Sequence, residues 1–226
     1  SITAEWSSCC GNGGPMPKPK QRRERHLSPV LHIYCEGAKT EPFYLEDYIR
    51  KRFPGTRLIL IEKTPKTTPK QLVEAAREKL RCAPAGDVVW VAYDREGPTK
   101  YSDSLHAGAR QKAGGKVQIA LSNVCFEVWL LLHFQSTCGA HDSCDDLLHR
   151  SRLKEHIPDY DKANRREYSA EEIARARQNA KRVNESTKRG ANPEWTQPHQ
   201  WNPYTDVHKL LDAIDDFGRK YCSRQP

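Results

Sequence analysis

Short apolar runs alternate with amphipathic segments along residues 30–121 of the chain. The apolar runs are rich in β-branched and aromatic residues, which is typical of strands buried on both faces. The segments between them carry apolar residues at helical spacing and follow capping residues such as Thr40 and Thr68. The predicted strands are 30–35, 57–61, 87–93 and 117–121, and the predicted helices are 41–52, 69–80 and 103–112. This order predicts an α/β fold with a mostly parallel four-stranded sheet flanked by helices.

The sequence after the fourth strand predicts a helical C-terminal extension. Ser122 and Asn123 are in position to cap an apolar helix at 126–134, although Asn123 would equally suit a phosphate or substrate contact. Three further helices are predicted, near 147–155, 169–185 and 204–221. We therefore divide the chain into a disordered basic N-terminal arm (1–29), an α/β core (30–135) and a helical extension that packs back on the core (136–226).

The balance of charge favours a polyanionic partner. Lys and Arg number 37 against 29 Asp and Glu, and the net charge of +8 makes nucleic acid the first candidate. No apolar stretch reaches the length of a membrane span, and the N-terminus lacks the apolar segment of a signal peptide. We therefore expect a cytoplasmic protein without a membrane partner, whose eight irregularly spaced Cys residues are reduced.

The N-terminal arm has two notable features. Residues 1–15 begin without Met and precede Met16, the single Met of the chain, so we expect that translation starts there and that residues 1–15 are not native. Residues 18–25 are strongly basic. Two interpretations of this basic segment stay open, an arm that binds nucleic acid and a solvated tail that keeps the protein in solution.

Carboxylates follow two of the predicted strands. Glu36 comes directly after the first strand, and Asp94 and Glu96 come at the end of the third. Because ligands bind beyond the carboxyl ends of parallel strands, we expect these acids to converge. Carboxylate oxygens suit Mg²⁺ or Mn²⁺, and such a site can cleave a phosphodiester. The ordinary explanation of Asp94 and Glu96 is a solvated turn, but the matching Glu36 favours the metal site.

Two more side chains are candidates for the same site. Lys39 lies in a loop that opens a helix, where it can contact the scissile phosphate or simply be solvated. Glu127 lies in an apolar helix, and because a buried carboxylate needs a partner we expect it near the metal or a lysine. His133 of the same helix is expected to be structural.

Other motifs have both a functional and an ordinary explanation. Cys138, His141 and Cys144 have a spacing that suggests zinc, but it is not a common structural-zinc layout. The segment 165–189 could present a basic face to RNA, although a salt-bridged surface helix is the commoner explanation. Its basic residues include Arg175, Arg177, Lys181 and Arg182. Trp195 and Trp201 could stack a base, but packing on the core is the commoner role.

Several blocks of sequence resemble a known family. The block Cys35-Glu36-Gly37-Ala38-Lys39-Thr40-Glu41-Pro42-Phe43-Tyr44 is followed by Asp94-Arg95-Glu96 and by the segment Ser122–Phe134. Together with the C-terminal block Asn202–His208, these residues resemble the RloB family, in the right order over about residues 30–211. The first and third blocks are the most specific.

This resemblance implies a toprim-like domain, the metal-dependent fold shared by topoisomerases, primases and the overcoming-lysogenization-defect nucleases. That fold places one Glu after its first strand and an Asp-x-Asp pair after its third, which here correspond to Glu36, Asp94 and Glu96. The chain departs from the pattern at Glu96, a longer acid that still binds metal but displaces its carboxylate by about one methylene. A reduced or altered metal preference is the expected consequence.

The resemblance also implies antiphage defence by abortive infection in prokaryotes, commonly beside an AAA-type ATPase encoded nearby. RNA such as tRNA is the implied target in preference to DNA, and a homodimer is compatible with the family. We expect a nuclease dependent on Mg²⁺ (or Mn²⁺) in which Glu36, Asp94 and Glu96 hold metal while Glu127 and Lys39 assist. The alternative is a non-catalytic interaction module regulated by the partner ATPase, and nucleotidyl transfer ranks last.

Overall fold

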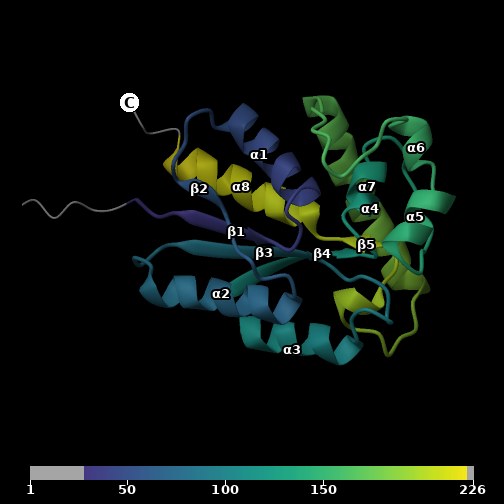
Figure 1. Cartoon of the computed structure of the whole chain (residues 1–226), viewed down its shortest axis with the longest axis horizontal. Coiled ribbons are helices and arrows are strands. Elements are labelled where there is room, and N and C mark those ends of the chain that lie inside the picture. The colour runs from purple at the N-terminus through teal and green to yellow at the C-terminus, as the bar shows by residue number, and fades with distance from the viewer. Residues whose placement is uncertain (1–27, 223–226) are drawn as a thin grey trace, which may run out of the picture.

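A five-stranded sheet forms the centre of the computed structural model, which describes residues 28–222 (Figure 1). The strands are β1 (Leu31–Cys35), β2 (Ile59–Glu62), β3 (Val88–Asp94), β4 (Val117–Asn123) and β5 (Tyr204–Thr205). Their order across the sheet is β2-β1-β3-β4-β5. All four predicted strands are present, and each pairs in parallel with its neighbours among the four.

Helices cover both faces of this sheet. Figure 1 shows α1 (Thr40–Arg52) and α8 (Val207–Tyr221) on one face, and α2 (Pro69–Cys82) and α3 (Asp103–Ala113) on the other. The second and third helices begin at capping residues, because Thr68 Oγ1 caps α2 and Ser102 Oγ caps α3. The capping role predicted for Thr40 is wrong, because Thr40 is the first residue of α1 and no side chain caps this helix. α3 ends at Gly114, whose left-handed backbone (φ +57°) suits a residue without a Cβ.

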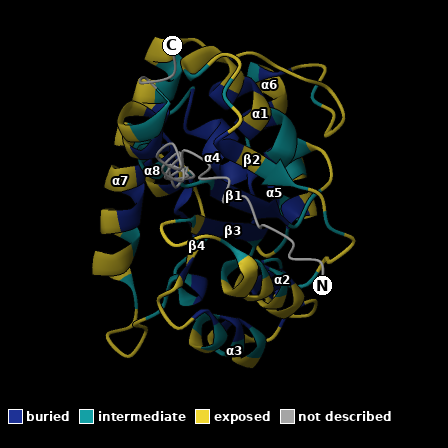
Figure 2. Cartoon of the chain, turned by 90° about the vertical axis from the view of Figure 1, so that its left-hand side faces the viewer, coloured by how far each residue is buried: buried dark blue, intermediate teal, exposed yellow. Residues whose placement is uncertain are grey.

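Alternate residues of the strands face opposite layers, which explains their unbroken apolar sequence. In β1, Leu31 and Ile33 belong to the core beneath α1 and α8, whereas Tyr34 belongs to the core beneath α2 and α3. In β3, Trp90 belongs to the core beneath α1 and α8, and Val91 belongs to the core beneath α2 and α3. Figure 2 shows the buried strands enclosed by helices whose outer surfaces are exposed. Both faces of the sheet are therefore dry, as parallel sheets require.

The prediction of four strands is wrong, because a fifth strand joins the sheet beside β4. Thr205 and Tyr204 pair antiparallel with Ser122 and Asn123, so the sheet is mixed. The sequence pattern placed Tyr204 and Thr205 at the start of the last helix. They form a strand instead because the Ser122 and Thr205 hydroxyls lie 3.1 Å apart and the Asn184 side chain bonds both backbone groups of Thr205.

The predicted helix over 126–134 is also shorter than expected. Ser122 and Asn123 extend β4, and the helix α4 covers only Glu127–Leu131. Asn123 is not a helix cap, because its amide donates to the carbonyls of His199 (3.1 Å) and Trp201 (2.6 Å). This buried amide also lies outside the cavity described below, so the substrate contact proposed for it is not supported.

The remaining helices complete the layer around α4. They are α5 (Cys144–Arg150), α6 (Leu153–His156), α7 (Ala170–Gly190) and a short 3₁₀ turn at Pro198–Gln200. α7 begins with the capping box of Ser169 and Glu172. Buried residues of α7 and α8, such as Ala176 and Leu211, lie in the same apolar core as Leu31.

Two remaining predictions concern the N-terminal arm and membrane spans. The basic segment 18–25 and the rest of residues 1–27 lie outside the described residues. Within residues 28–222, no helix is long and apolar enough to cross a membrane.

Candidate metal centre

The carboxyl ends of β1 and β3 lie side by side and bring Glu36 against Asp94. β1 and β3 pair in parallel with Cys35 opposite Ala92, so both strands end at the same edge of the sheet. The backbone N–H of Asp94 donates a hydrogen bond of 3.0 Å to Glu36 Oε2, and the Tyr101 hydroxyl donates one of 2.9 Å to Glu36 Oε1. The Glu36 carboxylate is thus held in one orientation.

A cavity of about 440 Å³ opens at this edge, and we call it the acidic cavity. The five residues singled out from the sequence all line it: Glu36, Lys39, Asp94, Glu96 and Glu127. Its wall also includes Glu41, Lys100, Tyr101 and Lys162, which the sequence analysis did not select. Within residues 28–222, the oxygens of Glu36, Asp94 and Glu96 do not all lie within 4.8 Å of one another.

Glu96 adopts a backbone conformation that side chains rarely take. Its φ is +57°, in the left-handed region, which costs about 1–2 kcal/mol for a residue with a Cβ. Its N–H donates to the Val124 carbonyl at 2.9 Å, and its Oε1 lies 2.8 Å from Lys100 Nζ. Strain of this kind concentrates at functional sites, and here it turns the Glu96 side chain toward the cavity.

Glu41 is a further acid of the cavity, which its position in the sequence did not distinguish from an ordinary helix residue. It lies in the first turn of α1, is only 5% exposed and lines the acidic cavity. The adjacent Gly37 has a steric role, because a Cβ at this position would collide with the Glu41 carboxylate. The signal was present in the sequence as Gly37 four residues before Glu41, but a Glu in the first turn of a helix also has an ordinary explanation.

The acids of the cavity repel one another in a partly dry environment. Burial raises the pKa of Glu36 to about 7 and outweighs its two hydrogen bonds, which act to lower it, while Glu41 and Glu96 add a smaller repulsion. Burial, followed by the charges of Glu41, Glu127 and Glu36, raises the pKa of Asp94 well above its usual range. Burial also raises the pKa of Glu41. This concentration of carboxylates is typical of a functional site, and a cation would relieve it.

Three lysines lie around the same acids. Lys39 follows β1, Lys100 forms the ion pair with Glu96, and Lys162 Nζ lies 3.4 Å from Glu127 Oε1. Lys162 comes from the loop after α6, more than 30 residues beyond α4, and no local pattern pointed to it. These ammonium groups give the rim of an acidic cavity the charge needed to attract a phosphate.

Glu127 is buried and has more partners than predicted. It is 1% exposed and accepts hydrogen bonds from the Tyr160 hydroxyl (2.6 Å) and the Cys144 thiol (3.3 Å). Burial acts to raise the pKa of Glu127, but the Lys162 ammonium and the Tyr160 hydroxyl outweigh it and hold that pKa below its usual range. The expectation of a lysine beside this buried carboxylate is confirmed.

Cys125, Glu127 and Cys144 form a compact cluster that could hold a metal ion. Their ligand atoms all lie within 4.8 Å of one another, the only such group among residues 28–222. The proposed combination of Cys138, His141 and Cys144 is therefore not assembled. His141 Nδ1 instead bonds Asp146 Oδ2 at 3.0 Å, because Asp146 lies in the first turn of α5 beside it.

Other candidates have structural roles. His133 is fully buried between the Tyr44 hydroxyl (2.9 Å) and the Trp129 carbonyl (3.0 Å), as expected of a structural histidine. Arg177 forms ion pairs with Asp212 and Asp215, so this part of α7 faces α8. Trp195 is 46% exposed, and the expectation that it packs on the core is wrong because it lies in an irregular loop.

Comparison with known proteins gives one result. The family model described as RloB-like protein matches residues 31–214. The chain belongs to the RloB family. Neither the curated proteins nor the solved structures contain a match to this RloB-like chain. The matched region spans every element from β1 to most of α8 and includes all the acids of the cavity.

Proposed function

We propose that this RloB-like protein is a metal-dependent nuclease of the toprim type that cleaves nucleic acid, RNA such as tRNA rather than DNA. The observation that carries the proposal is the convergence of Glu36 and Asp94 at the carboxyl ends of adjacent parallel strands, in one cavity with Glu96 and three lysines. Ligands of open α/β sheets bind at this edge. The net charge of +8 over the whole chain favours a polyanionic substrate.

The acids fit a hard divalent cation. Glu36, Asp94 and Glu96 offer only carboxylate oxygens, which Mg²⁺ and Mn²⁺ prefer, and burial together with neighbouring carboxylates raises the pKa of Glu36 and Asp94. When bound, such a cation supplies an activated water and neutralises charge on the phosphate. The Cys125, Glu127 and Cys144 cluster offers softer donors and suits Zn²⁺ better than Mg²⁺.

The chain's own groups position the substrate. Lys39 and Lys162 lie on the rim, where their ammonium groups can hold a phosphate against the acids. Tyr101 and the Asp94 backbone fix the orientation of Glu36, which limits the reorganisation needed when substrate enters. Glu127 in turn holds Lys162 in place.

The wider setting of the proposal comes from the family. We infer that the nuclease is the toxic effector of an abortive-infection defence against phage and that an AAA-type ATPase restrains it. Glu96 in place of the second Asp of the toprim pair is part of this proposal, since its strained backbone brings the longer side chain to the cavity wall.

The test is cleavage of total tRNA and of plasmid DNA with Mg²⁺, Mn²⁺ or EDTA. We expect metal-dependent cutting of tRNA by the wild type and its loss in Asp94→Asn. The matched control is Asp216→Asn, which removes an exposed carboxylate of α8 that pairs with Arg219. Absence of cutting from either substrate, also with the partner ATPase present, would contradict the nuclease and leave the interaction module.

A further inference from the structure

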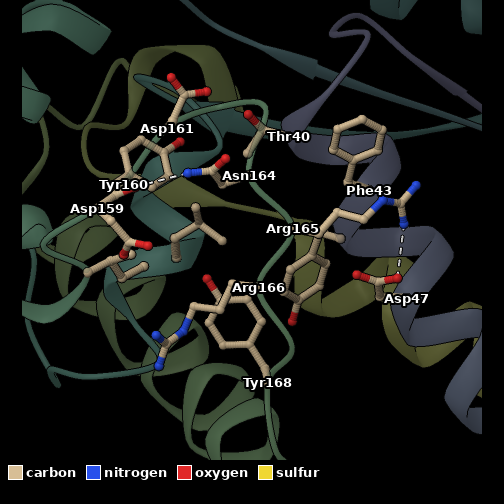
Figure 3. Close-up of a pocket in the computed structure, with 13 residues that line it drawn as sticks. Thr40, Phe43, Asp47, Asp159, Tyr160, Asp161, Asn164, Arg165, Arg166 and Tyr168 are labelled. Carbon is tan, nitrogen blue, oxygen red and sulfur yellow. Dashed lines mark hydrogen bonds and ion pairs between the residues drawn. The ribbon is translucent and has the colours of Figure 1, made fainter.

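A second cavity, of about 270 Å³, lies beside the acidic one and is not used by the proposed chemistry. It is enclosed by α1 on one side and by the loop between α6 and α7 on the other (Figure 3). Phe43 and Tyr44 contribute from α1, and Tyr160 and Tyr168 contribute from the loop. We call it the aromatic pocket.

The two cavities share a wall. Thr40 lines both of them, and its hydroxyl lies 3.5 Å from the Lys162 carbonyl. Tyr160 lines the aromatic pocket while its hydroxyl donates a 2.6 Å hydrogen bond to Glu127, which lines the acidic cavity. A group held in the aromatic pocket therefore lies next to one held among the acids, with Thr40 and Tyr160 between them.

The chemistry of the aromatic pocket suits a flat, polar-edged ring. Phe43 presents a ring on which a planar cation already lies, since the Arg165 guanidinium is 4.2 Å from its centroid. The rim carries the amide of Asn164 and the carboxylates of Asp159 and Asp161, and Figure 3 shows Asn164 and Asp161 on the loop opposite Phe43. Aromatic faces with amides and carboxylates at the edge are how proteins bind unstacked bases.

Two polar side chains of the pocket, Arg165 and Asn164, are already held in place. Arg165 Nη1 lies 3.0 Å from Asp47 Oδ1, and its Nη2 lies 2.5 Å from Glu46 Oε2. Asn164 Nδ2 donates to the Asp159 carbonyl at 3.2 Å, which orders the rim of the loop. The pocket is therefore preformed, and a base entering it has little to reorganise.

We propose that the aromatic pocket receives a nucleobase of the strand whose phosphate lies in the acidic cavity. This inference rests on the proposed nuclease function and adds that the substrate is an unpaired segment with one base turned out of its stack. The base stacks on the outer face of the Arg165 guanidinium, whose other face lies on Phe43, and its hydrogen-bonding edge meets Asn164. The pocket then sets which base lies beside the cut.

The direct test is binding of single nucleotides, which does not depend on cleavage. Ribo- and deoxyribonucleoside 5′-monophosphates are added to the full chain and followed by saturation-transfer NMR with EDTA present. Phe43→Leu keeps the apolar bulk but removes the ring on which the Arg165 guanidinium lies flat, and we expect affinity to fall about five- to a hundredfold. Phe53→Leu is the matched control, because Phe53 ends the same helix and packs on the core away from the pocket.

A second variant, Asn164→Ala, changes only an exposed loop residue and guards against a folding defect in Phe43→Leu. We expect it to weaken binding of one base more than the others. Nucleotide binding that is reduced in both variants and kept in Phe53→Leu supports the pocket, whichever sugar is preferred. No signal from any nucleotide, or equal binding by wild type and Phe43→Leu, would overturn it.

The same variants separate this inference from the proposed function. If nucleotides bind through Phe43 while neither tRNA nor plasmid is cut, the nuclease fails and the pocket stands. If the wild type cuts tRNA but Phe43→Leu cuts at the same bases and at the same rate, the nuclease stands and the pocket fails.

Discussion

The substitution Glu36→Gln should stabilise the metal-free protein at alkaline pH. Burial and the charges of Glu41 and Glu96 raise the pKa of Glu36 from 4.5 to about 7, so its ionised form destabilises the fold. For an acid whose pKa is raised on folding, stability falls as pH rises from 4.5 to 7, and the loss is complete above pH 7. Glutamine has nearly the same shape and no charge.

The size of the effect follows from the pKa of Glu36. A pKa raised from 4.5 to about 7 corresponds to about 3 kcal/mol once the carboxyl is ionised. Two donors now bond the Glu36 carboxylate, the Tyr101 hydroxyl and the Asp94 N–H, whereas Gln offers only one acceptor oxygen. The hydrogen bond lost in the variant reduces the gain in stability by about 1 kcal/mol. The expected net gain at pH 8 is about 2 kcal/mol, or about 4–8 °C in Tm for a chain of this size.

The assay is thermal and urea unfolding in EDTA at pH 8 and at pH 4. At pH 4 the side chain at position 36 is neutral in both proteins, so we expect the variant to be equal to the wild type or about 1 kcal/mol less stable. Glu74→Gln is the control, because Glu74 lies on the surface of α2 and pairs with Lys112. A Glu36→Gln variant that is less stable by the same amount at both pH values would show that burial does not raise the pKa of Glu36 as inferred.

Three further substitutions probe the cavity, the support of Glu127 and the contact between α7 and α8. Lys162→Met should destabilise the fold by about 1–2 kcal/mol in urea unfolding, because the buried Glu127 loses the cation paired with it. The effect stays below that of a fully buried pair because Lys162 is half exposed. Gly37→Ala should push the Glu41 carboxylate aside and lower metal-dependent cleavage about a hundredfold, measured as initial rates on tRNA. Arg177→Leu should cost about 1–3 kcal/mol in urea unfolding, since the buried Asp215 carboxylate loses one of the cations that pair with it.

Each of these has a matched control on the same kind of residue. Lys154→Met and Arg182→Leu change exposed basic residues and should leave stability within about 0.5 kcal/mol. Gly139→Ala adds a Cβ that meets nothing within 4 Å and should leave cleavage unchanged. Losses in the controls that match those in the test variants would show that the effects are unspecific.

The parallel part of the fold was predictable because its signals are local. A strand buried on both faces appears in sequence as an unbroken apolar run, and the caps Thr68 and Ser102 mark where helices begin. β5 was not predictable in the same way. A strand of two residues, of which Thr205 is bonded by Asn184 of α7, has no periodicity of its own, and its conformation exists only because β4 lies beside it.

In the site, too, some residues could be predicted from local sequence and others arise only from tertiary packing. Glu36 and Asp94 could be paired from sequence because parallel strands bring their carboxyl ends to one edge. Lys162 and Tyr160 could not, since they come from an irregular loop that reaches the cavity through tertiary packing. Cys144 was noticed for the wrong reason, because its partners are Cys125 and Glu127 rather than the nearby His141.

The central claim is that Glu36, Asp94 and Glu96 form a divalent-metal centre, and Mn²⁺ binding tests it most directly. Free Mn²⁺ would be titrated by electron paramagnetic resonance against the full chain and against Asp94→Asn. The account predicts saturable binding by the wild type that is competed by Mg²⁺ and lost in the variant. Equal binding by both proteins, or none by the wild type, would contradict it.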